Sequence, residues 1–178
     1  MSILKVSRMG HPVLREKTKT LTPTQVRQPQ LQQLIDDMME TMIDYDGVGL
    51  AAPQVFQSLR LTVLGYPDAD PDDPEAIPLT VLINPEWISL SEEKALGFEG
   101  CLSIPEIRGQ VPRSISVEVR ALDREAKPFT LRTAGFFARV LQHEIDHLDG
   151  ILFPDRMDDL NSLTFLEEYY RYWHKQEE

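Results

Sequence analysis

The chain has 178 residues and a formal net charge of −11, with 42% hydrophobic and 26% charged residues. This length allows one compact domain, residues 1–178, with enough core to fold without disulfide bonds, and the composition excludes a disordered chain. The acidic charge disfavours direct nucleic-acid binding, and no apolar run is long enough to span a membrane.

The hydrophobic pattern predicts three helices and four strands. Helical spacing of apolar residues, several of them methionines, predicts a helix over residues 29–44 that ends near Gly47, with the methionines in the core. Strands are predicted at residues 59–64, 79–83, 115–122 and 128–131, the last two forming a hairpin across residues 123–127. Further helices are predicted at about residues 135–148 and 162–173.

These elements indicate an α+β fold, because the strands flank one central helix without a regular strand–helix alternation. We expect antiparallel β-sheets packed around the central helix, followed by a C-terminal helix. Residues 66–79 are rich in proline and acidic side chains, and we expect them to form a solvated surface loop.

The strongest local signal is the sequence HEIDH at residues 143–147, within the predicted central helix. His143 and His147 are four residues apart and share a helix face, so both imidazoles can bind one metal ion. Glu144 lies beside that face, which suits a base acting on metal-bound water better than a third ligand. The alternative is an ordinary helix with two histidines on a polar face.

Cys101, the only cysteine of the chain, is the candidate third ligand. A catalytic site of this type needs three protein ligands and one open position, and a thiolate binds zinc, iron, cobalt or nickel. Gly100 before it and Pro105 after it suggest a bent strand whose backbone approaches another group closely. The alternative is a small buried hydrophobic residue. A lone thiol without a signal peptide also favours a cytoplasmic protein.

The third segment is GVGLAAPQ, residues 47–54. Its glycines and alanines permit unusual backbone shapes and close packing. Gln54 ends the segment with a neutral amide that can donate to a developing oxyanion. A simple turn after a helix is the alternative.

The ordered patterns GxGxAAxQ, EGCLS and QHExDHLxG resemble the three motifs of the peptide deformylase family. The N-terminal stretch SILKVSRMGHPVLR also looks like the start of that family, so the resemblance covers about residues 2–160. It implies a metal-dependent hydrolase that removes the formyl group from the N-terminal formyl-methionine of nascent proteins and releases formate.

The resemblance also implies a role for each motif residue. Cys101, His143 and His147 are expected to hold one divalent ion, with Fe²⁺ native and Zn²⁺, Ni²⁺ or Co²⁺ able to substitute. Glu144 is expected to take a proton from water and return it to the leaving amine. The side-chain amide of Gln54 and the backbone N–H of Leu102 are expected to stabilise the oxyanion.

The implied substrate is an extended peptide that binds by strand addition. Its backbone is expected to lie near Val48, Gly49 and Gly100, and its methionine side chain in an apolar pocket formed by Val48, Phe136 and Val140. Arg139 lies near the same helix face, so its charge must reach solvent or pair with an acid.

We expect a monomer that acts on nascent peptides and binds neither nucleic acid nor membranes directly. Some members of the family end in a basic helix thought to contact the ribosome. Here residues 165–178 carry more acidic than basic side chains, so any transient ribosome contact is not expected to use them.

Two rival functions use the same histidines. In a zincin-like endopeptidase, Glu167 or Glu168 would be the third ligand and Cys101 would be inert. In a non-catalytic zinc module, four protein ligands would close the site, with His174 a candidate for the fourth.

Overall fold

The computed structural model describes residues 2–70, 72–73 and 76–174. The described residues form four α-helices, which are α1 (Pro23–Val26), α2 (Pro29–Asp44), α3 (Gly135–Leu148) and α4 (Leu166–Tyr172). The strands are β1 (Gly49–Ala51), β2 (Leu61–Leu64), β3 (Thr80–Leu90), β4 (Lys94–Cys101), β5 (Ile104–Ser114), β6 (Ser116–Leu122), β7 (Pro128–Ala134) and β8 (Thr164–Phe165). None of these helices has the length and hydropathy needed to cross a membrane.

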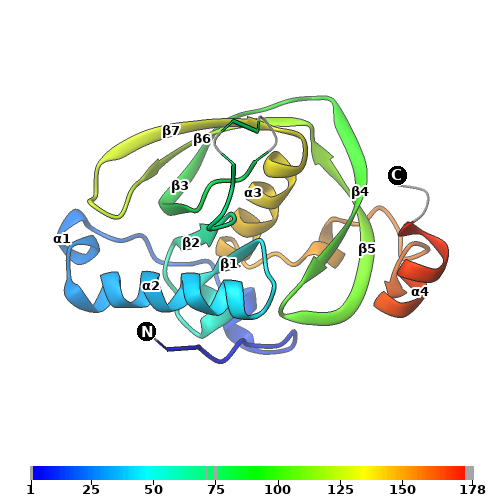
Figure 1. The fold of residues 1–178 in the computed structure, drawn as a ribbon, viewed down its shortest axis with the longest axis horizontal. Helices are drawn as coiled ribbons and strands as arrows, with labels where there is room; N and C mark the ends of the chain where they lie inside the picture. The colour runs from blue at the N-terminus through cyan, green and yellow to red at the C-terminus, as the bar shows by residue number, and fades with distance from the viewer. Residues whose placement is uncertain (1, 71, 74–75, 175–178) are drawn as a thin grey trace.

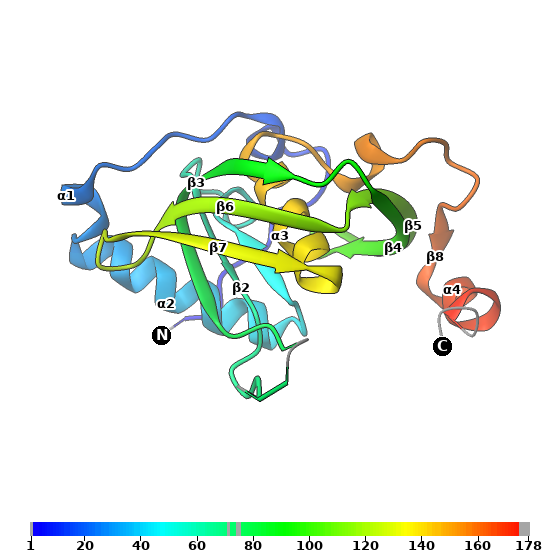
Figure 2. The same ribbon diagram turned by 90° about the horizontal axis from the view of Figure 1, so that it is seen from above.

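Two antiparallel sheets lie on either side of α3 (Figures 1 and 2). The larger sheet has the strand order β1-β2-β3-β6-β7, and the smaller has the order β4-β5-β8. β1 and β4 are therefore edge strands. This arrangement confirms the predicted α+β fold with a central helix and a C-terminal helix.

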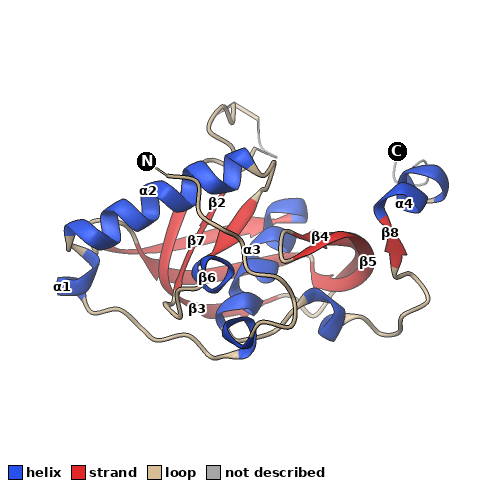
Figure 3. Ribbon diagram, turned by 90° about the horizontal axis from the view of Figure 1, so that it is seen from below, coloured by secondary structure: helices blue, strands red, loops and turns tan. Residues whose placement is uncertain are grey.

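The larger sheet is covered by α2 on one face and α3 on the other (Figure 3). Successive residues of β2 point to opposite faces, as expected for a strand. Val63 packs in the α2 cluster with Met38 and Met42, whereas Leu64 packs in the α3 cluster with Leu141. The predicted core position of the methionine stripe is therefore confirmed.

Helix α3 ends where the sequence predicted, because Gly150 follows it with a φ of +75°. This left-handed conformation is a common helix C-terminus and favours glycine. A Cβ atom at Gly150 would also lie 2.7 Å from the carbonyl oxygen of Arg15. The close approach fixes the end of α3 against the N-terminal part of the chain.

The predicted bounds of the 29–44 and 135–148 helices are confirmed, and so is the β6–β7 hairpin, but several other bounds are wrong. β2 begins only at Leu61, because Leu59 forms an isolated bridge with Lys19. β3 continues to Leu90 and β7 to Ala134, since β6 pairs with both over their added length. Helix α2 ends at Asp44, and the left-handed residue after it is Asp46, with Gly47 donating to the carbonyl of Met42.

The C-terminal helix is shorter than predicted. Residues 164–165 form β8 instead, because Thr164 and Phe165 pair with Arg108 and Ile107 of β5, and α4 then runs from Leu166. The predicted loop at residues 66–79 is mostly exposed where it is described, except that Ile77 is buried in the α3 cluster. Residues 71, 74 and 75 of that loop lie outside the described residues.

Candidate metal centre and active site

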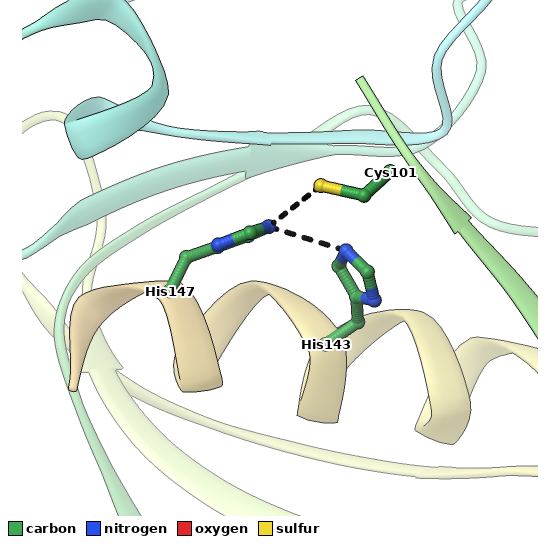
Figure 4. Close-up of side chains that lie close together, drawn as sticks. All are labelled: Cys101, His143 and His147. Carbon is green, nitrogen blue, oxygen red and sulfur yellow. Dashed lines mark hydrogen bonds between the residues drawn. The ribbon is translucent and has the colours of Figure 1, made fainter. Parts of the chain in front are cut away.

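Cys101 at the end of β4 and two histidines of α3 form one buried cluster (Figure 4). The Cys101 Sγ, His143 and His147 ligand atoms all lie within 4.8 Å of one another. The Nε2 atom of His147 is 3.3 Å from Sγ and 3.2 Å from Nε2 of His143. The structure thus brings the three predicted metal ligands together, from two segments that are 42 or more residues apart.

The charges in this cluster fit a bound cation. Burial alone raises the pKa of the Cys101 thiol, but the adjacent His147 and His143 outweigh it and hold that pKa well below its usual value. Burial likewise lowers the pKa of His143, but Cys101 and Glu99 outweigh it and raise that pKa. A positive charge is therefore favoured among these atoms. A divalent ion of borderline softness can take the place of a proton here, because thiolate and imidazole donors suit such an ion.

Glu99 orients His143 for such a role. Its Oε2 atom lies 2.9 Å from Nδ1 of His143, so an Nδ1–H donated to this carboxylate leaves Nε2 facing the cluster. Arg113 donates to both carboxylate oxygens of Glu99, at 2.9 and 3.0 Å. Although burial raises the pKa of Glu99, the hydrogen bonds from Arg113 and His143 hold it well below the usual range. No role could be predicted for Glu99 from the sequence, because its partners Arg113 and His143 lie on β5 and α3 and are distant along the chain.

Arg139 also binds Glu99, as its charge required. Its NH1 atom donates to Glu99 Oε1 at 3.0 Å and to the carbonyl of Val111 at 2.8 Å, and its NH2 atom donates to the carbonyl of Ala95 at 2.7 Å. The guanidinium lies over Gly97, where a Cβ atom would be 2.9 Å from Cζ of Arg139. Arg139 therefore ties α3 to the face of β4 and β5.

Glu144 lies beside the cluster, in close contact with β1. A Cβ atom at Gly49 would be 2.3 Å from Oε1 of Glu144, so only glycine leaves room for this carboxylate. The hydroxyl of Thr62 donates to Oε2 at 3.4 Å. Burial raises the pKa of Glu144, and the nearby histidines offset part of that rise. A carboxyl group with a raised pKa is suited to accepting and returning a proton near neutral pH.

Gln54 is oriented by a short 3₁₀ turn over residues 52–55 and is 1% exposed. Its Oε1 atom accepts from the backbone N–H of Ala51 at 2.8 Å, which directs Nε2 toward the metal cluster. Nε2 lies 3.6 Å from Sγ of Cys101. Leu102 follows Cys101 directly, in the two-residue turn between β4 and β5.

Most of the side chains described above line one cavity of about 410 Å³. It contains the predicted residues Val48, Gly49, Gln54, Gly100, Cys101, Leu102, Phe136, Val140, His143 and Glu144 in its lining. His147, 1% exposed, lies behind the lining. Val140 is buried, whereas Phe136 is 57% exposed and so stands at the rim of the predicted methionine pocket.

Several lining residues were missed in the sequence. They are Arg8, Tyr45, Asp46, Phe98, Glu99, Glu106, Arg108 and Leu166. Most belong to the β4–β5 hairpin or to segments packed against it, and no pattern in the sequence predicted that hairpin. Leu166 comes from α4, at the far end of the chain.

The structure does not bring the rival ligands to the cluster. Glu167 and Glu168 are paired with Arg171 on the surface of α4. His174 contacts the rings of Tyr169 and Tyr170 instead. Among the described residues, the groups able to hold a metal are Cys101, His143 and His147.

Comparisons with known proteins of similar sequence and of similar fold point to one family. The sequence model of a family described as polypeptide deformylase matches residues 3–162. Peptide deformylase 1 of Nitrosomonas europaea is 40% identical, over 93% of each chain, and peptide deformylase 2 of a Nostoc species is 42% identical, over 94% of this chain and 93% of the relative. A Met-Ala-Ser-bound class I type b peptide deformylase from Acinetobacter baumannii superposes with a TM-score of 0.81 at 39% identity, over 88% of this chain and 100% of the other.

Proposed function

The chain belongs to the peptide deformylase family and is a metal-dependent hydrolase that removes the N-formyl group of formyl-methionyl peptides, and we propose how its own residues perform this reaction. One observation carries the assignment of roles. The ligand atoms of Cys101, His143 and His147 converge at a cavity of about 410 Å³ that Cys101, His143 and Glu144 line.

Cys101, His143 and His147 hold one divalent metal ion in this proposal, with Fe²⁺ the native ion and Zn²⁺, Ni²⁺ or Co²⁺ able to replace it. One thiolate and two imidazoles form a donor set that suits all four ions. When bound, the ion supplies Lewis acidity, which lowers the pKa of water toward neutrality. Glu99 keeps Nε2 of His143 free for this ligation through its contact with Nδ1.

Glu144 is the general base and general acid of the proposed reaction. It takes a proton from the attacking water and returns it to the leaving amine, which frees formate and the new N-terminus. Its burial against Gly49 holds the carboxylate in place and keeps its pKa raised. Gln54 Nε2 and the backbone N–H of Leu102 donate to the oxyanion of the tetrahedral intermediate.

The substrate peptide binds in extended form between β1 and β4. Both are edge strands, and both line the cavity, β1 through Gly49, which follows the lining residue Val48, and β4 through Gly100. Main-chain pairing of this kind accepts any side-chain sequence. The methionine side chain enters the apolar end of the cavity, against Val48, Phe136 and Val140.

The whole chain, residues 1–178, is one catalytic domain in this proposal and acts as a cytoplasmic monomer. Its net charge of −11 argues against direct nucleic-acid binding. Contact with the ribosome is at most transient and does not use the C-terminus, because Glu167 is 79% exposed there and Glu168 lies beside it. Residues 175–178 of the acidic tail lie outside the described residues.

The direct test is formate release from formyl-Met-Ala-Ser by protein purified without oxygen, with elemental analysis of the same sample. We expect formate release that scales with the content of one divalent ion per chain, iron above the others. Metal loss with unchanged formate release would overturn the proposed roles, and a full zinc content without any formate release would support a non-catalytic zinc module.

A further inference from the structure

The C-terminal segment, residues 164–173, reaches the cavity through one residue, Leu166. β8 pairs with β5 through Arg108 and Thr164. Helix α4 follows β8 directly and lies beside the same end of the smaller sheet (Figures 2 and 3). This segment lies beyond residues 3–162, the part of the chain that matches the family. Leu166, the first residue of α4, nevertheless lines the cavity together with the metal ligands Cys101 and His143.

The two faces of β4 border different helices. The side chain of Glu99 points toward α3, where it contacts His143 and Arg139. The side chain of the preceding residue, Phe98, points toward α4, where its ring lies 4.9 Å from that of Tyr169 and 5.5 Å from that of Trp173. We call these the α3 face and the α4 face of β4.

A peptide that extends the sheet at the edge of β4 must alternate in the same way, because successive side chains of a strand point to opposite faces. Its methionine side chain lies on the α3 face, against Phe136 and Val140, according to the proposed function. The side chain of the next residue then lies on the α4 face. There the cavity is lined by Phe98 and Leu166, both half-buried and apolar.

We propose that Leu166 is a specificity-determining residue, which contacts the side chain of the second substrate residue and favours a long apolar side chain there. The proposal rests on the strand-addition binding proposed above. The ring of Phe98 packs against the ring of Tyr169 in α4 and that of Trp173 directly after α4, so the apolar surface is already ordered before a peptide binds. A preordered surface loses little conformational entropy on binding, and burial of apolar side-chain area then favours leucine over alanine.

The test compares kcat/KM for formyl-Met-Leu-Ser and formyl-Met-Ala-Ser in the metal-loaded enzyme. We expect the unaltered enzyme to prefer the leucine peptide by roughly four- to fifteenfold, the effect of burying one or two methylene groups. Leu166→Ala should bring this ratio close to one, because the leucine peptide then loses an apolar contact that the alanine peptide does not make. Leu166→Met, which keeps an apolar side chain of similar length, should retain the preference.

Leu163→Ala is the matched control, because Leu163 directly precedes this segment, is 39% exposed and does not line the cavity. It should leave the ratio unchanged. An unchanged ratio in Leu166→Ala, or an equal loss on both peptides, would overturn the proposal, since the second result means that Leu166 only supports the segment. Absence of formate release from both peptides in the unaltered enzyme would instead contradict the proposed function itself.

Discussion

Neighbouring side chains at the start of the HEIDH sequence have different tasks, and single substitutions separate them. Glu144→Gln keeps the shape of the side chain that fills the space against Gly49 but removes the base. We expect it to retain a full metal content and to lose about 10²–10⁴ in kcat, the scale for a positioned proton-transfer group. Elemental analysis and formate release on one formyl-peptide measure both quantities.

His143→Ala, one residue away, is the contrasting variant. It should lose the metal, because two remaining ligands are too few to hold the ion. Glu144→Asp should recover little activity, since a shorter side chain withdraws the carboxylate from its position. Loss of metal from a folded Glu144→Gln protein would make Glu144 a ligand and exclude the proposed role.

The charge of Glu99 gives a pH-dependent prediction. Hydrogen bonds from Arg113 and His143 outweigh burial and hold the pKa of Glu99 below its unfolded value. Such a group stabilises the fold above its unfolded pKa of about 4.3, and this contribution is lost as the pH falls toward the folded pKa. The difference in unfolding free energy between the metal-free wild type and Glu99→Gln should therefore be largest near neutral pH and shrink below about pH 4.

Urea unfolding at a series of pH values measures that difference. Glu92→Gln, at an exposed position in the turn before β4, is the control and should show no such trend. A difference between wild type and Glu99→Gln that is constant from pH 7 to pH 3 would mean that the carboxylate contributes by shape and not by charge.

At the scale of elements, the two long helices could be predicted from the sequence and the β4–β5 hairpin could not. Helices α2 and α3 have a local apolar period and clear ends, so their bounds follow from nearby residues alone. In the hairpin, three glycines and two prolines interrupt the alternation of a strand, at positions 97, 100, 105, 109 and 112. Its buried charges, Glu99 and Arg113, look like surface residues until their partners are known.

The residues of the site divide in the same way into predictable and unpredictable ones. Cys101, Gln54 and the histidines carry residue types whose chemistry is visible in isolation. Three other residues acquire their roles only through contacts between distant segments. Glu99 contacts β5, Arg139 contacts β4, and Leu166 lines the cavity. Residue chemistry was therefore predictable, whereas the residues that position it were not.

Arg139 is the connection between α3 and the hairpin, and its removal tests how far the site depends on that connection. Arg139→Ala removes the Arg139 donors from three backbone carbonyls and one of the two donors to Glu99 Oε1, which still accepts from Arg113. We expect a loss of about 1–3 kcal/mol in unfolding free energy, the cost of leaving buried polar groups unpaired. Because the proposed peptide site lies along β4, KM should rise more than kcat falls.

Arg132→Ala on β7 is the matched control, since that side chain is 79% exposed and forms a surface ion pair with Glu118. Exposed pairs of this type contribute about 0–1 kcal/mol, so little change is expected. If Arg139→Ala were as stable as Arg132→Ala, the guanidinium would not hold the hairpin in place.

At the scale of the whole molecule, the acidic charge predicts weak interaction with ribosomes. RNA phosphates repel a chain with a net charge of −11, and α4 presents Glu167 and Glu168 at its surface. In co-sedimentation at low salt, we expect the protein to stay in the supernatant. The double variant Glu167→Lys/Glu168→Lys should pellet more, and salt should reverse this. Salt-sensitive pelleting of the unaltered protein would instead reveal a basic contact elsewhere.

The two strand edges that border the cavity have a further consequence, for the solution behaviour of the protein. Unpaired edges are templates on which a second molecule can add a strand, which leads to aggregation. Here β1 is only three residues long, and β4 is bent by an irregularity in its pairing between Glu99 and Cys101. Short and bent edges resist association with another sheet, yet they suffice for a few residues of a single chain. Strand edges that are open enough for the proposed peptide binding are thus compatible with a protein that stays dispersed at high concentration.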